Sequence, residues 1–108
     1  MFVDSHCHLD FPELSDRIDE VLAAMQERRV SHALCISVNM EKWPAVLALA
    51  EAHGNLWASV GKHPDQAEGR EPDVAELVRL ASHPRIVAIG ETGLDYYWFK
   101  DAPEWQRE

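Results

Sequence analysis

Short apolar runs alternate with amphipathic stretches along most of the chain. The four runs are typical of strands and cover residues 1–5, which are apolar at Phe2 and Val3, and residues 33–38, 56–60 and 86–89. Between them, apolar residues recur at helical spacing, with stripes at Ile18, Val21, Leu22 and Met25, at Val46, Leu47, Leu49 and Ala50, and at Val74, Leu77, Val78 and Ala81. The pattern predicts the order strand, helix, strand, helix, strand, helix, strand.

Strands separated by helices of this length indicate βαβ units and a parallel sheet. The sequence has no glycine-rich nucleotide-binding loop, so a (β/α)8 TIM barrel is favoured over a Rossmann fold. A complete barrel needs about 250 residues, and this chain has 108. We therefore expect an α/β single domain, residues 1–108, formed by the first four strands and three helices of a TIM barrel. A complete flavodoxin-like domain of four strands is the alternative.

The last residues have the pattern of a further helix start. Asp101 suits an N-cap, Pro103 the first turn and Glu104 the acidic third position, yet the sequence ends at Glu108. One turn of helix is not stable by itself, so this pattern favours the N-terminal part of a longer protein. Half a barrel would leave the edges of its first and fourth strands unpaired, and we expect such a fragment to self-associate or to be poorly stable.

Composition narrows the possible partners and the cellular location. The formal net charge of −9 gives no general attraction to anionic membranes and no basic footprint of a typical nucleic-acid binder. No apolar run reaches the roughly 18 residues of a membrane span, and Asp4 and His6 interrupt the N-terminal run, so we predict no signal peptide. A cytoplasmic protein is expected, with Cys7 and Cys35 as buried, reduced thiols.

Polar side chains follow the end of each predicted strand. His6 and His8 follow the first, Asn39 the second, His63 the third and Glu91 the fourth. Active sites of parallel barrels lie at the carboxyl ends of the strands, so these residues should share one rim. Alternation along a strand points both imidazoles of His-x-His to one face. Together with Glu91, the two histidines would hold a divalent ion and leave coordination positions open for water or substrate. Taken without Glu91, the two histidines are equally well interpreted as ordinary polar residues with hydrogen-bond partners.

Several nearby residues have two open interpretations. Asp4 either accepts the second ring N–H of a histidine ligand or is an ordinary solvated or capping aspartate. His63 either contacts an anionic substrate group or bonds backbone within its loop, and Lys62 is expected to be solvated. The aromatic residues 96–99 either stack a base or a sugar or, as favoured here, form a packed lid over the barrel mouth. We expect capping or surface roles for the histidines at helix ends and connections, His32, His53 and His83.

Three motifs resemble the TatD-type metal-dependent deoxyribonucleases of the amidohydrolase superfamily. They are Asp4-Ser5-His6-Cys7-His8-Leu9-Asp10, Gly61-Lys62-His63-Pro64 and Gly90-Glu91-Thr92-Gly93-Leu94-Asp95-Tyr96. Their order and spacing agree with the family, and the resemblance covers the whole chain. It implies a TIM barrel with one or two divalent metal ions (Mg, Mn or Zn) that hydrolyses phosphodiester bonds in DNA.

The resemblance also implies roles for individual residues. His6 and His8 match the metal ligands of the first strand, and Glu91 matches the carboxylate that ligates, and often bridges, the metals. His63 matches a histidine thought to contact the scissile phosphate, so Glu91 and His63 are the catalytic candidates and His63 the candidate for substrate binding. The family places two further histidines and an aspartate on later strands, and these cannot be assigned within the 108 residues.

The predicted function is a metal-dependent hydrolase of the TatD DNase type, with DNA as the substrate of the full-length protein and no membrane partner. Metal-dependent hydrolysis of another ester or amide is one alternative, because the same His-x-His start serves that chemistry in the wider superfamily. The other alternative belongs to a different class: a catalytically incompetent fragment that acts as a metal-binding or self-associating module.

Overall fold

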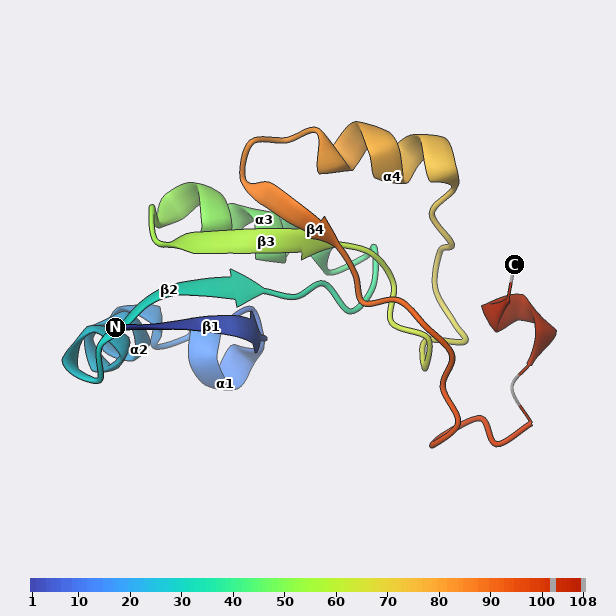
Figure 1. Ribbon diagram of the computed structural model, residues 1–108, viewed down its shortest axis with the longest axis horizontal. Helices are drawn as coiled ribbons and strands as arrows, with labels where there is room; N and C mark the ends of the chain where they lie inside the picture. The colour runs from blue at the N-terminus through green and yellow to red at the C-terminus, as the bar shows by residue number, and fades with distance from the viewer. Residues whose placement is uncertain (102, 108) are drawn as a thin grey trace.

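The computed structural model describes residues 1–101 and 103–107 (Figure 1). Its parallel sheet has the strand order β1 (Phe2–Cys7), β2 (Val30–Cys35), β3 (Leu56–Val60) and β4 (Ile86–Ile89). Each strand is therefore hydrogen-bonded to the next one along the chain. A flavodoxin-like sheet would place its first strand between the second and the third. The sequential order is that of a barrel and is not flavodoxin-like.

The α-helices lie between successive strands, and a 3-10 helix follows β4. They are α1 (Pro12–Ser15), α2 (Ile18–Glu27), α3 (Trp43–Ala52), α4 (Val74–Ala81) and the 3-10 helix η1 (Glu104–Gln106). α2 contacts β2, α3 contacts β3, and α4 contacts both β3 and β4. Right-handed crossovers that always advance to the next strand place these helices on one face of the sheet. Of the helices in the described residues, none is long and apolar enough to cross a membrane.

The core lies between this helical layer and the sheet. Its buried residues come from β2, β3, β4, α3 and the loops that follow β1 and β2: Leu9, Ala33, Cys35, Met40, Val46, Ala50, Leu56, Ala58, Val60 and Ile86. The predicted stripe of α2, from Ile18 to Met25, packs against this core. Removal of these side chains from water is the main favourable contribution to folding. It also fixes the strand ends that carry the candidate metal ligands.

β2 begins and ends earlier than expected. The strand was predicted over residues 33–38 and lies at Val30–Cys35. Val30 and His32 pair with Phe2 and Val3 of β1. This pairing extends the strand to residues that lie outside the apolar run and therefore could not be predicted from hydropathy. His32 is consequently an exposed strand residue, and its prediction as a helix-end or connection residue is wrong.

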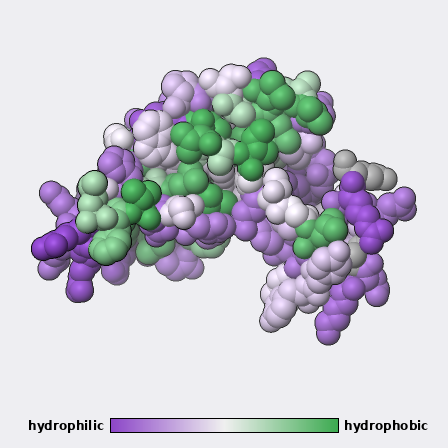
Figure 2. Space-filling model, viewed as in Figure 1, coloured by the Kyte–Doolittle hydropathy of each residue, from purple (hydrophilic) through white to green (hydrophobic). Residues whose placement is uncertain are grey.

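The buried face of α4 differs from the predicted stripe. Leu77, Leu80 and Ala81 pack against the core, whereas Val74 and Val78 are 78% and 60% exposed. The helix is turned so that positions 77, 80 and 81, rather than 74 and 78, meet the sheet. Figure 2 shows the resulting apolar surface over the region of α4 and β4.

The helix predicted from Asp101 does not form in the described residues. The chain there forms only η1, with Pro103 at its N-cap position rather than in its first turn, while residues 102 and 108 lie outside the described part. The sequence pattern does not predict one further helical turn, α1, which begins at Pro12. A helix of four residues is too short to show helical periodicity in its apolar residues.

Candidate metal centre

Two buried serines join the carboxyl ends of β2, β3 and β4. The Ser59 hydroxyl accepts a hydrogen bond from the Ser37 amide (2.9 Å) and donates one to the Gly90 carbonyl (3.1 Å). The Ser37 hydroxyl donates to the Gly61 carbonyl (2.8 Å). Both serines are 0% exposed, so each of these groups depends on its protein partner. The network fixes Gly90, and therefore the start of Glu91, beneath the rim.

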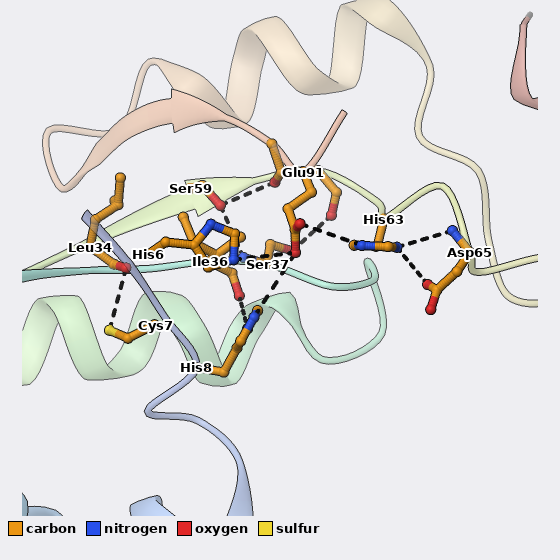
Figure 3. Close-up of polar contacts among 12 residues, drawn as sticks. His6, Cys7, His8, Leu34, Ile36, Ser37, Ser59, His63, Asp65 and Glu91 are labelled. Atoms are coloured by element: carbon orange, nitrogen blue, oxygen red, sulfur yellow. Dashed lines mark hydrogen bonds and ion pairs between the residues drawn. The ribbon is translucent and has the colours of Figure 1, made fainter. Parts of the chain in front are cut away.

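The rim brings together the three metal ligands predicted from the sequence. Nε2 of His6 lies 3.7 Å, and Nε2 of His8 4.0 Å, from Oε2 of Glu91. One ligand atom from each of the three residues lies within 4.8 Å of the others (Figure 3). The donor set of two imidazoles and one carboxylate suits a transition-metal ion with open coordination positions.

A backbone carbonyl prepares His8 for this role. Nδ1 of His8 lies 3.1 Å from the carbonyl oxygen of Ile36, which can only accept, so Nδ1 carries the proton. Nε2 of the neutral ring is then unprotonated and faces Glu91. This arrangement is typical of histidine ligands, whose second nitrogen donates to a carbonyl or carboxylate. The sequence gives no signal for this role of Ile36, because every residue type carries a backbone carbonyl.

Glu91 also faces His63 through its second oxygen. Oε1 of Glu91 is 3.4 Å from Nε2 of His63, whose Nδ1 is turned to Asp65 (Figure 3). Nδ1 lies 2.6 Å from Oδ1 of Asp65 and 3.0 Å from its backbone nitrogen. A protonated Nδ1 donates to the carboxylate, and an unprotonated one accepts from the amide. In both cases Asp65 holds the ring so that Nε2 points into the rim.

The cysteine between the two histidines points away from them. Cys7 pairs with Cys35 across β1 and β2, and its Sγ donates to the Leu34 carbonyl at 3.4 Å. The hydrogen bond with Cys35, together with burial, raises the pKa of the Cys7 thiol well above its usual range. Both thiols are free, as expected. A neutral thiol on the opposite side of β1 is not suited to join His6 and His8 as a ligand.

Asp4 and Asn39 have structural contacts in place of the anticipated site contacts. Oδ1 of Asp4 accepts from the backbone amide of His6 (3.0 Å), and no hydrogen bond among the described residues joins it to a histidine ring. The bulge between Asp4 and Cys7 changes the strand parity on which that interpretation depended. Oδ1 of Asn39 accepts from the Lys42 amide (2.9 Å) at the start of α3.

Two expectations for the loops are wrong. The Lys62 side chain is 5% exposed and paired with Glu71, so it is not a solvated lysine. Tyr96, Tyr97 and Trp98 are 60–75% exposed, so these residues do not form a packed lid in this structure. The Asp95 carboxylate accepts from the amides of residues 97, 98 and 99 in a turn that leaves Tyr97 and Trp98 exposed, whereas Phe99 is half-buried.

We expect Ser59→Ala to lower the free energy of unfolding by about 1–3 kcal/mol, because it leaves the Ser37 amide and the Gly90 carbonyl buried without partners. Affinity for a divalent ion should fall as well, since Gly90 precedes Glu91. Urea denaturation and metal titration measure the two effects. Ser82→Ala is the control: its hydroxyl bonds to Val78 at an exposed position, and we expect less than about 0.5 kcal/mol. Equal losses in the two variants would contradict the role of Ser59.

The parallel sheet with sequential strand order is that of part of an α/β barrel, and its rim carries a candidate metal centre. The family described as TatD related DNase matches residues 3–108, and the chain belongs to that family. The expected fold is confirmed by the crystal structure of YjjV, a TatD homolog from Escherichia coli K12. That structure matches with a TM-score of 0.83 and 32% identity over 98% of this chain and 42% of the other.

Curated relatives show the same relation in sequence. YcfH of Escherichia coli K12, named an uncharacterized metal-dependent hydrolase, is 37% identical over 98% of this chain and 41% of its own length. YabD of Bacillus subtilis, with the same description, is 29% identical over 100% of this chain and 43% of its own. The chain thus spans about two fifths of the length of these relatives.

Proposed function

We propose that the whole protein is a metal-dependent hydrolase of phosphodiester bonds in DNA, with His6, His8 and Glu91 among its metal ligands. The observation that carries this proposal is the convergence of these three residues, from the ends of β1 and β4, within 4.8 Å in a member of the TatD related DNase family. His63, on the other oxygen of Glu91, adds a donor suited to an anionic substrate.

The residues of this chain would bind the ion and orient the phosphate. A bound divalent ion supplies polarisation of a phosphoryl oxygen and lowers the pKa of a bound water. His8, oriented by the Ile36 carbonyl, and His6 supply nitrogen ligands, and Glu91 supplies the negative charge. Nε2 of a protonated His63 would donate to a phosphate oxygen, with Asp65 holding the ring. The imidazole ligands favour zinc, and the carboxylate extends the range to manganese and magnesium.

DNA cleavage by the metal-loaded whole protein tests the proposal. After chelator treatment we expect no cleavage, and its return with manganese or zinc. His8→Ala should reduce cleavage at least about 100-fold, because loss of even an indirect contact to a ligand costs 10–100-fold. His32→Ala, the same change at an exposed strand position, should leave cleavage unchanged. Failure of the wild type to cleave DNA with magnesium, manganese or zinc would overturn the proposal.

A metal-dependent hydrolase of another ester or of an amide is the second candidate. It is favoured by the names of the relatives, which specify metal-dependent hydrolysis without specifying the bond. The same three ligands would serve that reaction. A panel of phosphodiester, carboxylic ester and amide substrates separates the two candidates, since turnover of the latter two alone would exclude the DNase function.

A self-associating module is the candidate from a different class. Phe2 and Val3 of β1 are 66% and 62% exposed, and Val87 and Ile89 of β4 are 57% and 49% exposed. Apolar outer strands favour pairing with another chain.

We expect the 108-residue chain, if prepared alone, to form oligomers in sedimentation experiments, with a size that grows with concentration. A sharp monomer at all concentrations would exclude this role. Two reduced thiols in register support a cytoplasmic location for either form.

A further inference from the structure

A hollow lies directly beside the candidate metal centre. It has a volume of about 220 Å³, and its lining includes His63 and Glu91 as well as Lys62, Glu71 and Trp105. The hollow therefore includes the candidate metal ligand Glu91 and also His63, which would contact the scissile phosphate. Among the described residues that line it, Lys62 carries the one permanent positive charge. In a chain of net charge −9, this local charge is the feature that requires an explanation.

The ion pair of Lys62 is asymmetric. The Lys62 side chain is 5% exposed, whereas its partner Glu71 is 65% exposed, with 2.5 Å between Nζ and Oε1. Nζ also lies 6.0 Å from the centroid of the Trp105 ring, a distance compatible with a cation–π contact. A buried ammonium needs an anionic partner. The solvent-accessible carboxylate of Glu71 can leave that position to another anion at little cost.

We propose that Lys62 and Trp105 form a subsite for the nucleotide next to the scissile bond. This inference rests on the proposed function, since it names the neighbouring phosphate of a DNA strand as the anion. The phosphate takes the place of the Glu71 carboxylate on Lys62, and the Trp105 ring offers its face to the adjoining base. The substrate preferred by such a site carries at least two phosphates in a strand, which distinguishes a polynucleotide from a simple phosphodiester.

A purely structural ion pair would behave differently. If Lys62 and Glu71 only fix the loop between β3 and α4, loss of either partner weakens binding of any substrate. If Glu71 holds the place of a phosphate, loss of Lys62 weakens binding and loss of Glu71 strengthens it. Opposite signs for the two variants therefore identify the subsite.

Binding of a labelled single-stranded oligothymidylate with hydrolysis-resistant phosphorothioate linkages tests this inference. It is measured on the whole protein with manganese, at several salt concentrations. Lys62→Met should weaken binding about fivefold to tenfold and reduce the slope of log affinity against log salt by about 0.7, the value for one phosphate contact on a single strand. Lys42→Met, which removes an exposed lysine at the start of α3, should leave the affinity unchanged within about twofold.

Glu71→Gln should tighten binding about threefold or more, because the competing carboxylate is gone. Glu68→Gln removes the same charge from an exposed position of the same loop, so it measures the general effect of lower negative charge. Tightening by Glu71→Gln beyond that of Glu68→Gln, with weakening by Lys62→Met, supports the subsite. If the wild-type protein cleaves DNA but Glu71→Gln binds the oligonucleotide equally well or more weakly, the subsite is wrong and the proposed function still holds. A wild type that neither binds nor cleaves DNA overturns both.

Discussion

Glu91→Gln is expected to lower the affinity for divalent metal by more than about 100-fold and to reduce DNA hydrolysis to background. Loss of an outer partner of a ligand costs 10–100-fold, and this change removes the carboxylate itself. Both oxygens of Glu91 are engaged, Oε2 toward His6 and His8 and Oε1 toward His63. The amide keeps the shape but loses the negative charge. Calorimetric titration of the chelator-treated whole protein with manganese or zinc measures the affinity.

The control for this prediction is Glu13→Gln, an exposed residue of α1 that undergoes the same change of charge. It should keep wild-type metal affinity and hydrolysis. Retention of full metal affinity by Glu91→Gln, in a protein that still unfolds cooperatively, would show that Glu91 is not a ligand. The convergence of His6, His8 and Glu91 would then have a structural cause other than metal binding.

The strands that were predicted best are those with unbroken apolar runs. β3 and β4 lie where their patterns place them, because the runs are short and end at Gly61 and Gly90. The predicted bounds of β2 are wrong because its first residues are in a strand through their pairing with Phe2 and Val3, and not because of their own hydropathy. For α4, helical periodicity identified the element but not which of two neighbouring apolar faces meets the sheet.

The candidate ligands could be predicted because strand ends in a parallel sheet converge on one rim. Their supporting contacts could not, since they join residues far apart in sequence: Ile36 with His8, Ser59 with Gly90 and Lys62 with Glu71. A weak signal for the serines exists. Ser37 and Ser59 each interrupt an apolar run near its end, where a hydroxyl must find a buried partner. Neither the partner nor the burial of Lys62 follows from residue types alone.

Gly61→Ala is expected to destabilise the protein by about 3 kcal/mol, the upper part of the usual range for forcing extra atoms into a packed region. A Cβ at this position would lie 2.5 Å from the carbonyl oxygen of Gly90 and 2.7 Å from its carbonyl carbon. These are backbone atoms and cannot rotate away. The ends of β3 and β4 would have to separate, which breaks the 3.0 Å hydrogen bond from the Gly90 amide to the Val60 carbonyl.

The displacement of Gly90 would move Glu91 as well, so metal affinity should fall together with stability. Urea denaturation of the whole protein gives the change in unfolding free energy, and metal titration of the folded variant gives the change at the site. Gly54→Ala is the matched control, because a Cβ there meets nothing within 4 Å and its φ is not positive. It should be neutral or stabilising by up to about 1 kcal/mol. Wild-type stability and metal affinity in Gly61→Ala would mean that the close approach of the two glycine backbones does not hold Glu91 at the rim.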